Sequence, residues 1–239
     1  MINDEQKMVT ESLEFLASVD NYNHWMAQTL RPYLGDKVLE LGCGIGSILQ
    51  YFVMKQKLFG LDLDENLIDY CKHKFKGHSN CEFSAGDIFK DEFNFSEKPD
   101  SIMCMNVLEH IEDDNAALKW MNEYVTDDGN LVLLVPSHPC IYGAIDEAAG
   151  HFLRYTKKDL IAKVEANGWN VKKSFYFNFI GFFGWWLNSR ILKKRDIPIK
   201  STLLYDRYIV QLQHWAEGII TPPLGQSLIV IADKNKYRF

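Results

Sequence analysis

The sequence lacks the features that tie a chain to a membrane, to an oxidising compartment or to a thiolate metal site. Its five cysteines are odd in number and scattered, with no C-x-x-C pair, so they predict reduced, mostly buried thiols and no disulfide framework. No uninterrupted apolar run reaches the length that spans a bilayer. Residues 1–14 are charged and have no apolar signal core. We therefore expect a cytoplasmic protein that binds no metal.

Positive charge does not dominate the chain either. The formal net charge is −6, and an acidic chain argues against a general nucleic-acid-binding protein. The charge is uneven, because residues 1–135 hold 11 Lys and Arg against 24 Asp and Glu, whereas residues 136–239 hold 15 against 8. The basic second part leaves room for an anionic substrate or a membrane surface. An ordinary solvated surface explains it about equally well.

What the chain does have is a glycine-dense segment at residues 38–47, Val-Leu-Glu-Leu-Gly-Cys-Gly-Ile-Gly-Ser, with a further apolar run behind it. This pattern predicts a buried strand, a tight turn and the start of a helix. Alternate glycines allow left-handed backbone angles and the close approach of a ligand. The N–H groups of a helix start would point into the same gap.

The order of the glycines distinguishes two families of nucleotide-binding proteins. The dinucleotide fingerprint is G-x-G-x-x-G, but here the order is Gly42-x-Gly44-x-Gly46 and Ser47 replaces the third glycine. An acid, Glu40, lies two residues before the first glycine. This pattern resembles motif I of the class I S-adenosylmethionine-dependent methyltransferases. The resemblance implies an α/β, Rossmann-like sheet of seven strands in the order 3-2-1-4-5-7-6, with strand 7 antiparallel and helices on both faces.

Three later segments match the same family in order and spacing. A short strand at 57–62 ends in Asp62, about 20 residues after the first glycine, the spacing that places a carboxylate on a ribose. Asp64 is expected to cap the following helix. Asp87 follows a third strand at 81–86, where the family holds the adenine amino group. A fourth strand at 99–106 precedes Leu-Glu-His, in which His110 resembles a cofactor-pocket residue more than a base.

The resemblance therefore implies S-adenosylmethionine as the cofactor, with S-adenosylhomocysteine as its product. The cofactor-binding residues that it implies are Glu40, Gly42, Cys43, Gly44, Asp62, Leu63, Asp87, Ile88, Asn106, Val107 and His110. No Asn-Pro-Pro-Tyr motif follows the fourth strand, which removes the main sequence argument for methylation of adenine N6 or glutamine N5.

We predict one domain over residues 1–239. Two N-terminal helices, at 4–18 and 21–34, fill residues 1–35, and the cofactor-binding core covers 36–136. Residues 137–226 carry the substrate-side loops and an insertion, and the last strand lies at 227–233. A glycine-rich turn and Thr156 mark the entry to a further helix, with Thr156 as its N-cap.

The segment from His138 to Tyr155 leaves the carboxyl end of the predicted fifth strand, the edge where open α/β sheets bind ligands. It resembles a subgroup of small-molecule methyltransferases. His151 and His138 are the candidate bases, because imidazole titrates near neutrality, and Asp146 is the candidate that orients one of them. The predicted substrate-binding residues are Tyr22, Trp25, Tyr142, Arg154 and Tyr155, and Arg154 is expected to hold an anionic group.

An aromatic stretch at 175–187 is flanked by lysines and arginines as far as residue 195. Ordinary core or homodimer packing explains it, and so does a lid over a lipid-like substrate or peripheral contact with a membrane.

We expect a methyltransferase that acts at O, N or C on a small, partly apolar acceptor, for which the basic second part of the chain leaves an anionic group open. The partner would then be a small-molecule substrate and not a nucleic acid. Two alternatives stay open: a non-catalytic subunit that binds the cofactor and acts through a partner, and a protein-lysine methyltransferase.

Overall fold

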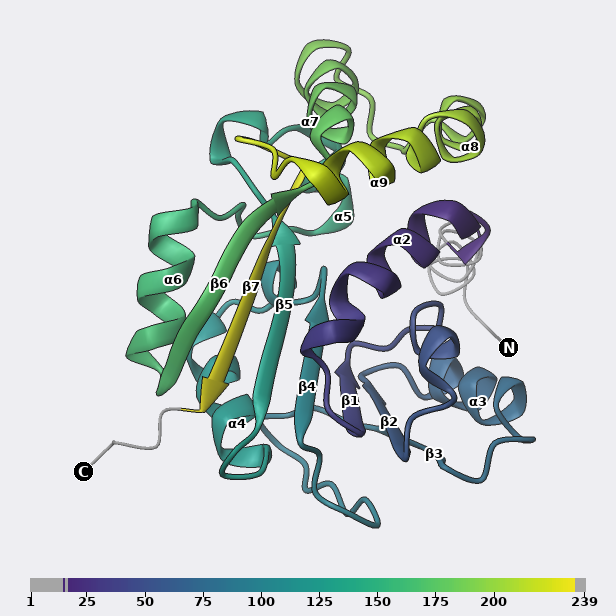
Figure 1. Ribbon diagram of the computed structural model, residues 1–239, viewed down its shortest axis with the longest axis vertical. Helices are drawn as coiled ribbons and strands as arrows, with labels where there is room; N and C mark the ends of the chain where they lie inside the picture. The colour runs from purple at the N-terminus through teal and green to yellow at the C-terminus, as the bar shows by residue number, and fades with distance from the viewer. Residues whose placement is uncertain (1–14, 16, 235–239) are drawn as a thin grey trace.

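The computed structural model describes residue 15 and residues 17–234, so most of the helix predicted at 4–18 lies outside the described residues. The apolar runs of the sequence form one seven-stranded sheet in the order β3-β2-β1-β4-β5-β7-β6 (Figure 1). All neighbours are parallel except that β7 runs antiparallel to β5 and β6. The predicted fold class is therefore confirmed. The strands are β1 Lys37–Leu41, β2 Lys57–Asp62, β3 Cys81–Ala85, β4 Ser101–Met105, β5 Asn130–Pro136, β6 Trp169–Phe177 and β7 Ser227–Lys234.

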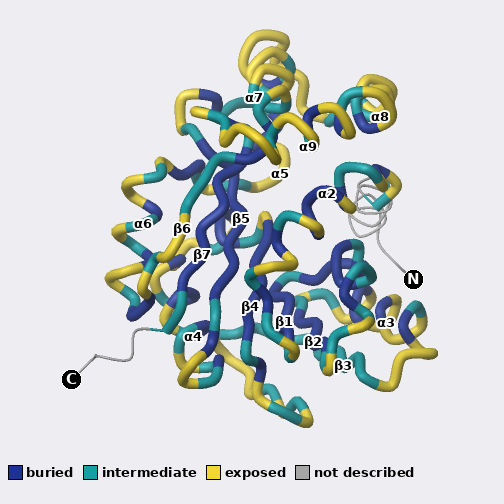
Figure 2. The backbone as a smooth tube through the Cα atoms, in the orientation of Figure 1, coloured by how far each residue is buried: buried dark blue, intermediate teal, exposed yellow. Residues whose placement is uncertain are grey.

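Helices cover both faces of the sheet. Helices α2 (Asp20–Leu30) and α3 (Glu65–Lys74) contribute to one apolar core, and α4 (Asp114–Tyr124) and α6 (Lys157–Ala166) contribute to the other. The central strands are buried along almost their whole length (Figure 2), as expected for parallel strands that are covered on both sides.

The helix starts follow local capping chemistry. The Asp64 side chain accepts a hydrogen bond from the Asn66 N–H at 2.8 Å and begins α3. The Thr156 hydroxyl accepts one from the Asp159 N–H at 3.2 Å and begins α6. Both caps are those expected from the sequence, since such side chains satisfy N–H groups that have no partner inside the helix.

The segment after the glycine turn differs from the prediction. No α-helix forms there, and the chain makes turns followed by a short 3₁₀ helix, η2 (Leu49–Phe52). Only ten residues separate Gly46 from Lys57, where β2 begins. At about 3.6 residues per turn, a connection of this length has room for fewer than three helical turns, and here it forms turns and η2 instead.

The last third of the chain builds a cap over the carboxyl ends of β4 and β5 (Figure 1). Its elements are the 3₁₀ turn η4 (Pro139–Ile141), α5 (Ala144–Ala149), α7 (Phe179–Trp185), the π-helical turn η5 (Trp186–Ile191), α8 (Ile199–Tyr208) and α9 (Val210–Ile219). The helix predicted near 203–219 is divided in two at Ile209. The Asp206 side chain of α8 accepts hydrogen bonds from the N–H groups of Asn21 and Tyr22, at 3.4 and 2.8 Å, and so ties the cap to the start of α2.

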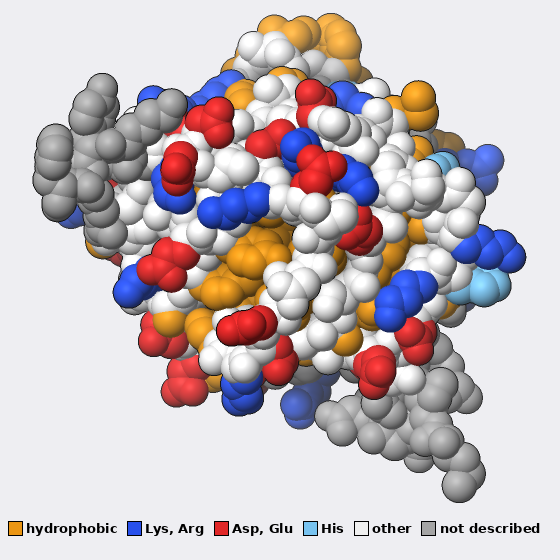
Figure 3. Space-filling model, turned by 90° about the horizontal axis from the view of Figure 1, so that it is seen from below, with side chains coloured by type: hydrophobic (Ala, Val, Ile, Leu, Met, Phe, Trp, Pro, Cys, Tyr) orange, Lys and Arg blue, Asp and Glu red, His pale blue; other side chains and the backbone are white. Residues whose placement is uncertain are grey.

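The cap is the most exposed apolar part of the described chain. Of the nineteen large hydrophobic side chains that are exposed, fourteen lie between residues 180 and 220. The opposite end of the molecule carries acidic and basic side chains interspersed around an apolar centre (Figure 3). Within the described residues, no helix combines the length and the apolar character needed to cross a bilayer.

Candidate active site

The glycine turn after β1 requires glycine for steric reasons. Gly42 and Gly46 have φ angles of +71° and +67°, a left-handed region that side chains make costly. A Cβ on Gly42 would lie 2.2 Å from Cγ2 of Val107, at the end of β4. The turn and the β4 exit therefore approach each other more closely than any other residue type at position 42 would allow.

The N–H groups of this turn do not point into an open gap as expected from the sequence. Those of Gly42 and Cys43 both donate to the Leu61 carbonyl, at 2.7 and 3.0 Å. That of Gly44 donates to Oδ2 of Asp62 at 2.8 Å. Because η2 replaces the expected helix, the turn is fixed against β2 by its own amides.

Asp62 lies at the carboxyl end of β2, as expected for a ribose-binding acid. Its Oδ1 accepts a further hydrogen bond from the Asp64 N–H at 3.2 Å. The Leu63 N–H also serves this carboxyl group, and since a carboxylate has about four acceptor positions, acceptor capacity is left for the ribose. Burial raises the pKa of Asp62 above its ordinary value. The neighbouring Leu63 side chain is exposed and free to contact a ligand.

Glu40 is the second acid of the cofactor motif, and it is buried. Its Oε2 has no hydrogen-bond partner, while the Leu49 backbone N–H serves the carboxyl group. Burial raises the pKa of Glu40 well above its ordinary range. A buried acceptor oxygen without a donor, two residues before the glycine turn, fits a ligand that brings polar hydrogens, as the amino-acid end of S-adenosylmethionine does.

The third acid, Asp87, lies just after β3. Its two oxygens accept hydrogen bonds from the Phe89 N–H at 2.9 Å and from Lys90 Nζ at 2.7 Å. The Lys90 ammonium lowers the pKa of Asp87, so the group is ionised and able to accept from an amino group. Ile88 packs against the core on the α4 side.

Asn106, at the end of β4, has a φ of +51° and an exposed side chain. A non-glycine residue in this region is strained, and such strain clusters at binding sites. The Cys43 thiol, by contrast, is buried, and its Sγ would lie 2.9 Å from a Cβ on Gly60. The role of Cys43 in cofactor binding stays a prediction.

The loop between β5 and α6 is organised around one buried carboxylate, Asp146. Its Oδ1 is hydrogen-bonded to His151 Nδ1 at 2.9 Å and accepts a hydrogen bond from Arg154 Nε at 2.7 Å. Its Oδ2 accepts from the Trp185 indole N–H and from the Gly143 N–H, both at 3.0 Å. Hydrogen bonds from these groups and the Arg154 charge lower the pKa of Asp146, although burial alone would raise it. The structure thus brings Asp146 and His151 together.

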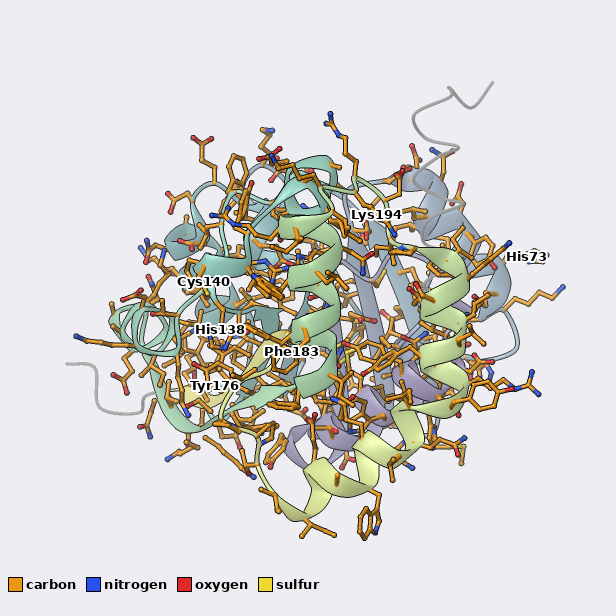
Figure 4. All side chains as sticks on the ribbon, turned by 90° about the horizontal axis from the view of Figure 1, so that it is seen from above. His73, His138, Cys140, Tyr176, Phe183 and Lys194 are labelled. Atoms are coloured by element: carbon orange, nitrogen blue, oxygen red, sulfur yellow. The ribbon has the colours of Figure 1, made fainter. Side chains whose placement is uncertain are left out.

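His138 leaves β5 with a φ of +60°. Its ring stacks on Tyr176 at 4.7 Å and meets the edge of Phe182 at 5.2 Å, and Figure 4 shows it beside Tyr176 beneath α7. Its Nε2 is buried and has no hydrogen-bond partner. Burial, and then the Arg154 charge, lower the pKa of His138, so the ring is neutral at pH 7 and able to take a proton.

His110 lies on the 3₁₀ turn η3 (Leu108–His110). Its ring meets that of His151 edge-on, with the centroids 4.7 Å apart. Burial, followed by the His151 charge, lowers the pKa of His110 to about 4. These contacts are with the loop after β5, so His110 belongs to the acceptor side as much as to the cofactor side.

Three predicted substrate residues are structural in this fold. Trp25 is in the core, with its ring 4.1 Å from that of Phe177. Tyr155 is buried, and its hydroxyl donates to Asp114 at 2.8 Å. Arg154 is buried against Asp146 and donates from Nη1 to the Ser137 carbonyl at 3.0 Å, so it anchors the loop, while its Nη2 is buried without a hydrogen-bond partner.

Tyr142 and Tyr22 are partly buried. The Tyr142 hydroxyl donates to the His151 carbonyl at 2.8 Å. Burial raises the pKa of Tyr22 to about 12, and its hydroxyl is hydrogen-bonded to Asn178 and Ser227. Both tyrosines therefore hold the acceptor side in place and stay predictions as substrate contacts.

Sequence patterns alone missed two residues. Glu109 is fully buried next to His151 and has no hydrogen bond to either carboxylate oxygen. Asn178 has a φ of +66°, and its side-chain oxygen accepts from the Gly181 N–H at 2.9 Å and from the Tyr205 hydroxyl at 2.7 Å. An Asn that ends a strand is a signal for a left-handed residue, whereas nothing in the sequence marks Glu109 as buried.

Comparison with known proteins points to one family. Residues 39–131 match the model of a methyltransferase domain, which covers the glycine turn and all three acids. This match, together with the fold, supports the predicted class I S-adenosylmethionine-dependent methyltransferase family and the predicted cofactor.

Two curated proteins and one solved structure are similar to this chain. An uncharacterised RNA methyltransferase of Clostridium acetobutylicum is 35% identical over 101 residues, 41% of this chain and 19% of that protein. A ubiquinone biosynthesis O-methyltransferase of Erwinia tasmaniensis is 26% identical over 110 residues, 45% of each chain. The chain thus matches less than half of the length of these curated relatives.

The third is a solved structure that holds a Haloferax volcanii methyltransferase with the Trm112 methyltransferase activator. It superposes with a TM-score of 0.64 at 15% identity, over 97% of this chain and 99% of that one. The two thus share the fold.

Proposed function

We propose that this methyltransferase transfers a methyl group from S-adenosylmethionine to a small, partly apolar acceptor bound under the cap. One observation carries the proposal. The loop after β5 holds a buried, unpartnered imidazole nitrogen of His138 between two aromatic rings. Apolar surroundings with one placed polar group are typical of small-molecule sites.

The residues at the strand ends hold the cofactor in this proposal. Asp62 accepts hydrogen bonds from the ribose, Asp87 from the adenine amino group, and the free oxygen of Glu40 from the amino-acid end. When bound, S-adenosylmethionine supplies a methyl group that is already activated on a sulfonium sulfur. The protein must then align the acceptor with that methyl, and such orientation contributes about 7–11 kcal/mol.

His138 is the proton acceptor in this proposal. Its neutral ring takes the proton of the acceptor at Nε2, and proton transfer of this kind contributes about 10²–10⁴-fold in rate. His151, the other candidate, has one nitrogen committed to Asp146. The aromatic side chains of α7 and β6 exclude water from the same space, which protects the reacting groups.

The apolar cap supports a lipid-like acceptor. The exposed side chains of α7 and η5 include Phe183, Trp186 and Leu187, and the basic residues that follow them include Arg190 and Lys194. An acceptor with an apolar tail and an anionic head would find both surfaces beside the site.

The experiment is transfer of a labelled methyl group from the cofactor into a cell extract, which is then divided into lipid, small-molecule, protein and nucleic-acid fractions. We expect the label in the lipid or small-molecule fraction. We expect His138→Ala to lower that transfer at least ~100-fold, while His73→Ala, on the last turn of α3, leaves it unchanged. Label confined to protein or nucleic acid would overturn the acceptor class.

A cofactor-binding partner subunit is the second candidate. The observation that favours it is the exposed apolar cap, because large apolar surfaces mark interaction sites. The Haloferax volcanii neighbour was solved with an activator protein. Absence of label from every fraction, together with normal cofactor binding, would favour this candidate.

A further inference from the structure

Three potential metal ligands converge between η3 and the loop after α5. They are Glu109, His110 and His151, and one ligand atom from each lies within 4.8 Å of the other two. The Glu109 Oε1 to His151 Nε2 distance is 3.9 Å. Tetrahedral ligands at about 2.0–2.2 Å from a metal lie ~3.4 Å apart, so a modest closure would bring the three onto one ion.

Burial raises the pKa of Glu109 to about 8, and a metal ion in contact with the carboxyl group would favour its ionised form. Its side chain is fully buried, and neither oxygen has a hydrogen-bond partner. Burying an unpaired carboxylate is costly. Arg154 attracts it electrostatically, but the hydrogen bonds of that guanidinium go to Asp146 and Ser137. The carboxylate therefore faces the two imidazoles with its acceptor capacity unused.

In each histidine one ring nitrogen is hydrogen-bonded to a protein group, as is usual for histidines that bind a metal. His151 contacts Asp146 through Nδ1 at 2.9 Å, and a ring nitrogen of His110 donates to the backbone of Gly150. Each ring thus has one nitrogen fixed by an acceptor. Such an outer contact sets the tautomer and leaves the second nitrogen as a lone-pair donor.

We propose that Glu109, His110 and His151 bind one divalent transition-metal ion of the zinc type. Two imidazoles and one carboxylate suit zinc, iron or cobalt and disfavour magnesium and calcium, which require oxygen ligands. Three protein ligands leave a position open for water or for an oxygen of the acceptor, as in catalytic zinc sites. His110 is exposed, so an ion reaches the cluster from solvent.

This site departs from the expectation that the chain binds no metal. That expectation rested on cysteine spacing, whereas the ligands are a buried Glu and two histidines 41 residues apart. The proposal does not depend on methyl transfer, because metal binding is measured without cofactor or acceptor. His138 is not a ligand and stays free as the base.

The test uses the full chain after removal of metal by a chelator. Isothermal titration with Zn²⁺ should show one ion per chain, and Co²⁺ should give the visible absorption of a nitrogen-ligated site. We expect Glu109→Gln, His110→Ala and His151→Ala each to weaken Zn²⁺ binding at least tenfold. Asp146→Asn should weaken it ~10–100-fold through the orientation of His151.

The controls are His138→Ala, which removes a nearby imidazole outside the cluster, and Cys140→Ser, which removes an exposed thiol. Both should keep wild-type affinity. Thermal unfolding of each variant without metal shows whether it folds, and Glu109→Gln is close enough in shape to fold where an alanine variant does not. Absence of stoichiometric Zn²⁺ binding, or wild-type affinity in folded Glu109→Gln, would overturn the proposal.

Discussion

The cofactor side and the acceptor side of this methyltransferase are stabilised in different ways. On the cofactor side, the glycine turn and Asp62 are fixed by backbone hydrogen bonds between β1 and β2. On the acceptor side, the loop from 138 to 155 holds only the short elements η4 and α5 and depends on the side chain of Asp146. The comparison teaches that backbone pairing in a sheet can position one half of a site, whereas one buried charge can position a loop.

This difference predicts that the largest stability effect comes from a single acceptor-side residue. Asp146→Ala removes the partner of the fully buried Arg154 side chain and frees three other donors. Breaking a buried ion pair from one side costs about 3–5 kcal/mol, so we expect a loss of that size in the free energy of unfolding. Urea denaturation measures it.

The matched control for this prediction is Asp159→Ala. Asp159 lies on the surface at the first turn of α6 and accepts only from Thr156, so its removal should cost less than about 1 kcal/mol. Equal losses in the two variants would mean that the loop does not depend on its central carboxylate.

The second prediction concerns binding on the cofactor side. Asp62→Ala removes the proposed acceptor of two ribose hydroxyls, and a hydrogen bond to a charged group contributes about 1.5–3 kcal/mol. We expect the affinity for S-adenosylhomocysteine to fall at least ~100-fold in calorimetry. Asp64→Ala is the control, since it removes the cap of α3 at a cost of about 1 kcal/mol in stability and should keep the affinity.

Two outcomes would contradict the ribose assignment. Wild-type affinity in Asp62→Ala would move the ribose to another acceptor. An equal loss in Asp64→Ala would mean that both acids act only on the conformation of the turn.

The sequence predicts the cofactor side more completely than the acceptor side. The strand order, the glycine turn and the position of Asp62 could be predicted, because they depend on local patterns and on spacing along consecutive elements. The short connection between Gly46 and β2 is a sign that no long α-helix forms there. The glycine motif nevertheless favours a helix start at this position.

The acceptor side was predictable only in part. The sequence placed His138, Asp146 and His151 in one loop, and the structure brings Asp146 onto His151. It did not show that Tyr155 faces Asp114, because that contact joins residues 41 apart in the sequence. It did not show that Arg154 is buried either, because its contacts with Asp146 and Ser137 depend on packing that no local pattern records.

The third prediction tests whether the glycine turn is under steric constraint. Gly42→Ala places a Cβ in the left-handed region and against Val107. The backbone strain alone costs roughly 1–2 kcal/mol, so we expect a lower melting temperature and weaker cofactor binding. Gly77→Ala is the control, since a Cβ there meets no atom within 4 Å. Equal melting temperatures for the two variants would show that the turn has room to move.

The smallest expected effect on stability lies at the cap, where the side chains are exposed and few contacts are lost. Leu187→Ser and Trp186→Ser should change the free energy of unfolding by less than about 1 kcal/mol. If the cap meets an anionic lipid surface, the same variants should lower retention on phosphatidylserine vesicles several-fold, because apolar side chains anchor such contacts. Met54→Ser is the matched control, since Met54 is 91% exposed on the cofactor side and should not affect retention. Unchanged retention in both cap variants would indicate that the exposed apolar surface binds a protein partner and not a lipid surface. The two sides of the molecule would then differ in what they bind as well as in how they are stabilised.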